Sequence, residues 1–355
     1  MPRGVRWILA ITAVLALAAL LVPAWAWKQI TRPLEMSTSA EGVVTIESGG
    51  SARSILETLE ERGVIGDATL ARGYLVLLMD SPALKAGEYE FRSGLSTIEV
   101  LGILARGEVI THAVTILEGL TVAETAALLA DAGFGDAGRF ESLMNDPALI
   151  EDLDSEARDL EGYVFPDTYH FARATPETEI VKELVRTFRT NYETVVLPTR
   201  LPEDKRSLRE VVTLASIVEK ETGLDEERSI VAGVYANRLR RRIGLYADPT
   251  IIYALKKMNR WDGNLRRADL KLESPYNTYL VSGLPPGPIA SPGLQSLLAA
   301  TRPDDVPYLY FVSRNDGSHV FSRTLAEHNR NVNKWQKQYW RDKWAAERRQ
   351  KAQTD

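Results

Sequence analysis

The chain has 355 residues, 45% of them hydrophobic, and a formal net charge of -5. Its length suits an anchor plus two or three compact units, and its charge gives no support to nucleic-acid binding through a basic surface. It contains no cysteine, which excludes disulfides, a thiolate nucleophile and cysteine-based zinc sites.

The first predicted element is a membrane-spanning helix over residues 7–27. This run is uncharged, with Arg3 and Arg6 before it and Lys28 after it. A bilayer core needs about 20 apolar residues in a helix, and flanking arginines mark the cytoplasmic side. We therefore expect a cytoplasmic tail at residues 1–6, an uncleaved anchor, and the rest of the chain outside the membrane.

A cleaved signal peptide is the alternative interpretation of this segment. Residues 24–26 read Ala-Trp-Ala, which resembles a cleavage site. The apolar run is longer than the roughly 7–15 residues of a signal core, which favours the anchor. Both interpretations export the remaining chain.

After a predicted polar linker, the pattern alternates short strands with helices. Ser96 and Glu99 form a capping box at the start of one helix, and Thr121 and Glu124 repeat it at the next. Such units suit a small carbohydrate-binding module, although capping boxes are common in any helical protein. The predicted strands are 43–46, 87–91 and 113–117, and the helices 52–62, 97–107 and 122–133.

From about residue 140 the pattern indicates one larger α+β unit. Helices are predicted at 208–222 and 229–241, followed by a proline- and glycine-rich stretch at 276–292. The charged residues from Trp335 onward are expected to form a solvated helix. The predicted fold class is therefore α+β.

Several kinds of chemistry lack their sequence signals. The chain has no H-E-x-x-H, P-loop, G-x-S-x-G or G-x-G-x-x-G motif, and its four histidines show no metal-ligand spacing. A Ser-His-Asp site assembled from distant positions stays open, although nothing points to one. We expect no metal and no organic cofactor.

Glu221 is the first candidate catalytic residue. It continues the apolar stripe of its helix, three and four residues after Val218 and Ile217. Burial and the negative end of the helix dipole would both raise its pKa, which suits a proton donor for glycosidic bond cleavage. Glu219 projects about 200° away on the helix. The alternative is that Glu221 pairs with an arginine of 238–242.

Seven short motifs follow one another in the second half of the chain. They are L-A-S-I-V-E-K-E-T (214–222), A-N-R-L (236–239), D-P-T-I-I-Y (248–253), S-P-Y-N-T-Y (274–279), G-L-P-P-G-P-I (283–289), P-Y-L-Y-F-V (307–312) and G-S-H-V-F (317–321). In this order they resemble the endolytic murein lytic transglycosylases, the MltG or YceG-like family. The resemblance extends over nearly the whole chain.

The resemblance implies a single-pass inner-membrane protein with a LysM-like subdomain and a periplasmic catalytic domain. It implies peptidoglycan glycan strands as substrate, cut internally near the membrane, and cell-wall synthases (penicillin-binding proteins) as candidate partners. The implied limits are 7–27 for the transmembrane helix, 28–42 for the linker, 43–110 for the LysM-like subdomain, 111–334 for the catalytic domain and 335–355 for the charged C-terminal helix.

The family's essential glutamate matches Glu221 best, with Glu219 as the other candidate. The implied mechanism needs one carboxyl group, which protonates the oxygen between N-acetylmuramic acid (MurNAc) and N-acetylglucosamine (GlcNAc). The resulting carboxylate then takes the proton of the muramyl 6-hydroxyl, which closes a 1,6-anhydro ring. Intramolecular attack has a proximity advantage over bound water.

Further residues are candidates for substrate binding or for orienting Glu221. Asn277 and Tyr279 would hold N-acetyl groups, or belong to a packed turn; Asp248 and Thr250 would orient Glu221, or cap a helix. The run 284–288 is a rigid cleft wall or a structural loop. The aromatic residues of 161–169 would stack on sugars, although packing in the core is the favoured interpretation.

Two other functions stay open from the sequence. A non-catalytic scaffold that binds peptidoglycan and recruits synthases would use the strand–helix units equally well, but it has no need for a carboxylate on an apolar stripe. A true hydrolase would need a second carboxylate to activate water. Glu219, Asp248 and Glu273 are the candidates for that role.

Overall fold

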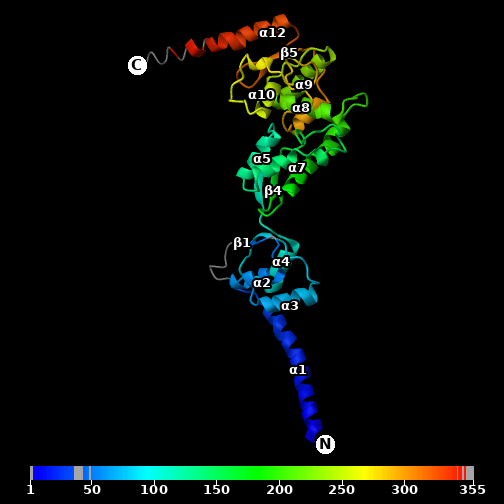
Figure 1. Ribbon diagram of the computed structural model, residues 1–355, viewed down its shortest axis with the longest axis vertical. Helices are drawn as coiled ribbons and strands as arrows, with labels where there is room; N and C mark the ends of the chain where they lie inside the picture. Colours follow the sequence, from blue (N-terminus) through cyan, green and yellow to red (C-terminus); the bar gives the residue numbers. More distant parts are fainter. Residues whose placement is uncertain (1–2, 36–42, 48, 342, 346–347, 349–355) are drawn as a thin grey trace. The chain divides into compact units, whose positions relative to one another are not determined.

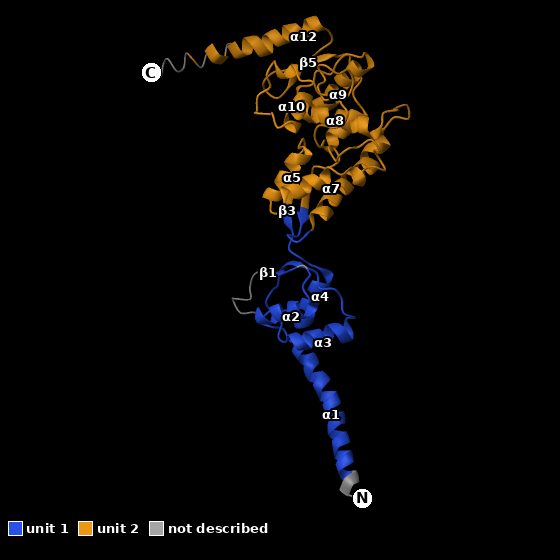
Figure 2. Ribbon diagram, in the orientation of Figure 1, with its two compact units in different colours: residues 1–113, 170–175 blue, residues 114–169, 176–355 orange. Residues whose placement is uncertain are grey.

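The computed structural model describes residues 3–35, 43–47, 49–341, 343–345 and 348. The chain is an α+β protein, as predicted, and it divides into two compact units (Figure 2). Unit 1 comprises Met1–Ala113 with His170–Thr175, and unit 2 comprises Val114–Tyr169 with Pro176–Asp355. Residues 36–42 of the predicted linker and the end of the predicted C-terminal helix lie outside the described residues.

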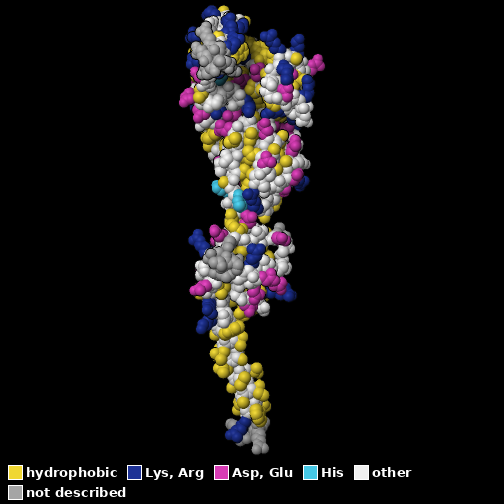
Figure 3. All heavy atoms as spheres, turned by 90° about the vertical axis from the view of Figure 1, so that its left-hand side faces the viewer, with side chains coloured by type: hydrophobic (Ala, Val, Ile, Leu, Met, Phe, Trp, Pro, Cys, Tyr) yellow, Lys and Arg dark blue, Asp and Glu magenta, His cyan; other side chains and the backbone are white. Residues whose placement is uncertain are grey.

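Helix α1 (Arg3–Thr31) contains the predicted anchor and continues four residues beyond it (Figure 1). The stretch Arg6–Thr31 has a mean hydropathy of 2.4 in its most apolar window, and its 26 residues extend about 39 Å. Figure 3 shows hydrophobic side chains along most of this helix. The helix is therefore long and apolar enough to cross a bilayer.

The rest of unit 1 is a small strand–helix module. Strand β1 (Val43–Ile46) pairs antiparallel with β2 (Gly87–Glu90), so that alternate side chains enter the core. The core is completed by three helices, α2 (Ala52–Glu61), α3 (Ala68–Leu78) and α4 (Thr97–Arg106). The predicted Ser96–Glu99 capping box is present, and Gly107 ends α4 with a φ of 73°. That this module is LysM-like stays a prediction.

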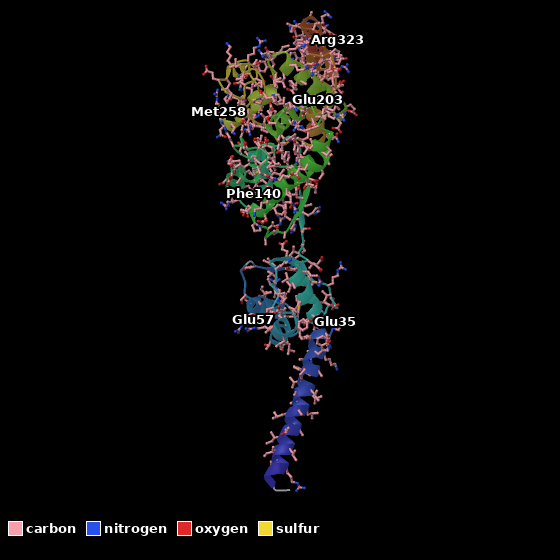
Figure 4. The ribbon with its side chains drawn as sticks, turned by 90° about the vertical axis from the view of Figure 1, so that its right-hand side faces the viewer. Glu35, Glu57, Phe140, Glu203, Met258 and Arg323 are labelled. Carbon is pink, nitrogen blue, oxygen red and sulfur yellow. The ribbon has the colours of Figure 1, made fainter. Side chains whose placement is uncertain are left out.

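Strands β3 (His112–Thr115) and β4 (Thr168–Phe171) form a two-stranded sheet, and Val114, Thr115, Thr168 and Tyr169 of these strands belong to unit 2. The second predicted capping box, Thr121 with Glu124, starts α5 (Val122–Asp131). Phe140, labelled in Figure 4, is completely buried. It belongs to α6 (Ala137–Met144), which packs against α5 and α7 (Glu177–Asn191).

The centre of unit 2 is α8 (Leu208–Glu221), against which α9 (Asp225–Arg240), α10 (Asp248–Lys257) and α11 (Leu294–Thr301) pack. Every residue of α8 from 211 to 218 is buried, so this helix lacks the single apolar face that the sequence suggested. Helix α9 starts four residues before its predicted start, because the acidic residues 225–227 occupy its first turn.

A hairpin and a terminal helix complete unit 2. Strand β5 (Tyr310–Ser313) pairs antiparallel with β6 (His319–Ser322), and α12 (Leu325–Val332) packs on both. Short 3-10 or π turns lie at Pro147–Leu149, Tyr192–Val196, Leu197–Thr199, Asp269–Lys271 and Asn333–Gln338.

Candidate active site

Glu221 is the last residue of α8. A capping box of Ser207 and Glu210 fixes the start of that helix. Its end is fixed by Thr222, whose backbone is extended and whose hydroxyl accepts a hydrogen bond from the N–H of Leu224 at 3.1 Å. The Glu221 carboxyl therefore lies at the carbonyl end of a buried helix, and its side chain is half-buried.

Tyr235 holds the Glu221 carboxyl from the neighbouring helix α9. Its hydroxyl donates a hydrogen bond of 2.7 Å to Glu221 Oε1. The Tyr235 ring is 1% exposed and meets the edge of Phe311 on β5, with centroids 5.8 Å apart. His319 on β6 packs in turn against Phe311 at 5.3 Å. The β5–β6 hairpin therefore holds the Tyr235 ring in place, and Tyr235 in turn positions the Glu221 carboxyl.

The surroundings of Glu221 suit a group that both gives and takes a proton. Burial raises the pKa of Glu221 to about 7; the Tyr235 hydrogen bond and the charge of Arg238 oppose this rise, and the charge of Asp248 adds to it. A carboxyl with a pKa near 7 is populated in both forms at neutral pH, which suits general acid–base catalysis.

Arg238 is buried without a carboxylate partner among the described residues. Its Nε and Nη1 donate hydrogen bonds of 2.6 Å to the carbonyls of Leu309 and Leu245. Its guanidinium lies 5.7 Å from the Tyr246 ring and 5.3 Å from the Tyr310 ring. The sequence left open an ion pair between Glu221 and an arginine; the structure places a tyrosine hydroxyl there instead.

Glu221, Tyr235 and Arg238 form what we call the Glu221 centre. Asp248 and Tyr279, two of the sequence candidates, also belong to it. The Tyr279 hydroxyl donates a hydrogen bond of 2.7 Å to Asp248 Oδ1, and its ring lies 5.3 Å from that of Tyr246. Asp248 is the first residue of α10, whose N-cap is Ala247. Asp248 and Tyr246 are exposed, and the charge of Asp248 acts on the half-buried Glu221 carboxyl.

Thr250 and Asn277 are completely buried, and their side-chain polar groups form hydrogen bonds with neighbouring residues. The Thr250 hydroxyl donates to the Ala247 carbonyl at 2.7 Å and lies 3.0 Å from the hydroxyl of Thr278. The Asn277 amide donates to two backbone carbonyls of residues 270 and 272, and its oxygen accepts the N–H of Tyr279 at 3.0 Å. Both residues thereby shape the backbone that carries Asp248 and Tyr279.

Glu219 lies on the other face of α8, away from this cluster. It forms an ion pair of 2.9 Å with Arg228 and accepts the N–H of Gly293 at 2.9 Å. Two other residues of the 214–222 motif also form hydrogen bonds that hold loops against α8. Ser216 accepts the N–H of Ile289 at 3.1 Å, and Lys220 donates to the carbonyl of residue 119 at 3.0 Å. The motif therefore combines three structural residues with Glu221.

The aromatic residues of 161–169 belong to the core, as favoured from the sequence. Tyr163, Phe165 and Tyr169 are each less than 8% exposed. The proline-rich run 284–288 lies beside the first half of α8. There the carbonyl of Pro286 accepts a hydrogen bond of 2.7 Å from Arg209. It lines a cavity at that end of the helix.

Sequence reasoning missed Tyr235, and it considered Arg238 only as an ion-pair partner. The two are three residues apart on α9 and share a helix face. A buried tyrosine and a buried arginine on one face are a signal of a polar centre. The two residues can be placed near Glu221 only from the packing of α9 against α8.

An α+β unit with one half-buried, tyrosine-bound carboxyl is suited to acid–base cleavage of a glycosidic bond. The chain belongs to the YceG-like family, whose model matches residues 44–334. It is 31% identical over 326 residues to the "endolytic murein transglycosylase" of Bacillus subtilis (strain 168), which covers 87% of this chain and 88% of that relative.

A second relative and a solved structure agree with this family. The "endolytic murein transglycosylase" of Streptococcus pneumoniae (strain ATCC BAA-255 / R6) is 29% identical over 333 residues. That match covers 84% of this chain but only 59% of the longer relative. A crystal structure of a putative yceG-like protein from Listeria monocytogenes has a TM-score of 0.57 and 30% identity, and covers 81% of this chain and 98% of that one.

Proposed function

We propose that this chain is a membrane-anchored endolytic transglycosylase that cleaves the MurNAc-β-1,4-GlcNAc bond inside murein glycan strands. Murein transglycosylase activity is the name that the curated relatives share. The observation that supports the chemistry is the hydrogen bond of 2.7 Å from Tyr235 to Glu221, at a half-buried helix end. Glu221 is the proposed general acid and general base.

The proposed reaction uses Glu221 twice. Its protonated carboxyl gives the proton to the bridging oxygen as the bond from that oxygen to the muramyl C1 breaks, and GlcNAc leaves with a free 4-hydroxyl. The carboxylate then takes the proton of the muramyl 6-hydroxyl, whose oxygen bonds to C1. The products are a 1,6-anhydroMurNAc end and a GlcNAc end, no water is consumed, and Glu221 is protonated again.

The neighbouring groups support this cycle in different ways. The Tyr235 hydroxyl stabilises the carboxylate form through its hydrogen bond, and Arg238 does so through its charge. Burial and Asp248 favour the protonated form. Glu221 can therefore exchange its proton in both directions at neutral pH.

The anchor gives this activity a location. Helix α1 is long and apolar enough to cross a membrane, and Arg3 and Arg6 precede its apolar run. By the positive-inside rule, the N-terminus is cytoplasmic and the residues that follow α1 face the cell wall. In the proposed arrangement the enzyme meets strands near the membrane, where the synthases that make them are its candidate partners.

The test compares the full chain with its Glu221→Gln and Glu219→Gln variants, in detergent, on uncrosslinked peptidoglycan strands. Products are identified by mass spectrometry. We expect internal fragments with 1,6-anhydroMurNAc ends from the parent and from Glu219→Gln. Glu221→Gln should lose at least about 100-fold in rate, the usual contribution of a general acid. Strand binding without cleavage by the parent would favour the scaffold.

A further inference from the structure

A second carboxyl group is buried in unit 2, away from Glu221. Glu161 is 5% exposed, and its Oε1 accepts the backbone N–H of Val122 at 3.2 Å. Burial raises the pKa of Glu161 to about 8, and the charge of Asp159 adds to the rise. The proposed cleavage has no use for this group. Its carboxyl is hydrogen-bonded to the N–H of Val122, at the start of α5, and to the hydroxyl of Tyr253 on α10.

Glu161 lies between two cavities. One, of about 140 Å³, is bounded by Tyr276 and Pro288, and the other, of about 610 Å³, opens toward Trp261. Both are lined by Asp159, Glu161 and Lys257. Glu221, Tyr235, Asp248 and Tyr279 line neither of them. The larger volume lies in the range of small-ligand sites.

The walls of this pair of cavities combine aromatic faces with fixed charges. The rings of Tyr253 and Tyr276 lie 4.9 Å apart, and Lys257 Nζ is 5.5 Å from the first and 6.0 Å from the second. Lys257 also lies 3.3 Å from Asp159 Oδ2. Trp261, in the loop that follows α10, is half-buried at the outer edge. Met258, which ends the helix next to this loop, is exposed (Figure 4).

Flat aromatic faces beside carboxylates and an ammonium group are suited to a sugar ring. The apolar face of the ring covers an aromatic side chain, and its hydroxyls meet the charged groups. A protonated Glu161 has an O–H that can donate to the carbonyl of an N-acetyl group. A purely structural role for Glu161 would explain its hydrogen bonds with Val122 and Tyr253 but not the position of Trp261.

We infer that the pocket of Glu161, Lys257 and Trp261 binds an N-acetylated sugar of the glycan strand, apart from the bond that is cut. This inference rests on the proposed function, because it takes the same strand as ligand. Helix α10 connects the two places: Asp248 at its start belongs to the Glu221 centre, and Lys257 at its end lines the pocket. Nine residues of helix separate them by about 14 Å. A glycan strand bound both at the Glu221 centre and in this pocket extends beyond the cleaved bond, so the cut is internal.

The experiment measures the binding of uncrosslinked glycan strands to the full chain in detergent, in a Glu221→Gln background that does not cut. Trp261→Ala should raise the Kd roughly tenfold, as expected for the loss of an aromatic anchor. Trp261→Phe should restore most of the affinity. Trp344→Ala, which removes an exposed tryptophan elsewhere in unit 2, is the matched control and should leave the Kd unchanged.

A second variant protects the result against an effect on folding. Lys257→Met keeps the aliphatic length of the side chain and should weaken strand binding in the same direction as Trp261→Ala. Unchanged affinity in both variants overturns the pocket, even if the parent cuts strands normally. Conversely, a parent that never forms anhydro ends would overturn the proposed function, while a Kd that depends on Trp261 would still support the pocket.

Discussion

The Tyr235 hydroxyl lies 2.7 Å from Glu221 Oε1, and the two residues come from different helices, α9 and α8. The bond opposes the effect of burial, because it stabilises the charged form of a carboxyl that burial would keep protonated. The tyrosine is itself fixed by Phe311 of the hairpin. The proton affinity of Glu221 therefore depends on three elements of unit 2.

Tyr235→Phe should move the pH profile of strand cleavage upward. Glu221 must carry a proton to act as the acid, so activity falls as the pH rises through its pKa of about 7. Loss of the hydrogen bond removes a cause that lowers this pKa, and the alkaline limb should shift to higher pH. The measurement is kcat/KM for strand cleavage from pH 5 to 9. Tyr308→Phe, which changes a tyrosine outside the centre, should not move the limb.

Asp248→Asn should move the same limb in the opposite direction. The negative charge of Asp248 raises the pKa of Glu221, and the amide removes that charge while keeping the size of the side chain. The asparagine oxygen can still accept the hydrogen bond of Tyr279. The same pH series measures the shift, and a limb that stays in place or moves upward would contradict the assigned geometry.

Local signals in the sequence predicted much of this fold. The capping boxes at Ser96, Thr121 and Ser207 each start a helix, because they satisfy N–H groups within a few residues. Helix α3 was missed because eight of its eleven residues are apolar and give no helical period. The single apolar face expected for α8 was wrong because neighbouring helices cover it on several sides.

The candidate site was predictable only in part. Glu221 could be chosen by its position on the helix, whereas Tyr235 required knowledge of how α9 packs. The opposite faces of Glu219 and Glu221 follow from the helix repeat, but the partner of each does not. Asp248 and Tyr279 were among the candidates by family resemblance, and their mutual hydrogen bond came from the structure.

Glu219→Ala should destabilise the protein without moving the pH limb. The change removes the ion pair with Arg228, which keeps its ion pairs with Asp225 and Glu118, and it frees the N–H of Gly293. Loss of a hydrogen bond to a buried charged group costs about 1.5–3 kcal/mol, which corresponds to a fall in Tm of roughly 3–12 °C for a unit of this size. Thermal unfolding of the detergent-solubilised chain measures it. An unchanged Tm would show that the pair contributes little to stability.

Gly162→Ala should also destabilise unit 2, through a steric clash. Gly162 has a φ of 84°, and a Cβ there would lie 2.5 Å from Pro288 and 2.8 Å from Val212. Strained backbone costs about 1–3 kcal/mol, and the clash adds to that. Gly283→Ala is the matched control, because its φ is 96° but no atom lies within 4 Å of the added Cβ. The Tm of Gly162→Ala should be the lower of the two.

The source of the oxygen at the new strand end tests the central claim most directly. Strands are digested by the full chain in water enriched in oxygen-18, and the new muramyl ends are analysed by mass spectrometry. If Glu221 directs attack by the 6-hydroxyl, these ends are 1,6-anhydro rings that contain no oxygen-18. Reducing ends that carry one oxygen-18 would show that water is the nucleophile, and the enzyme would then be a hydrolase.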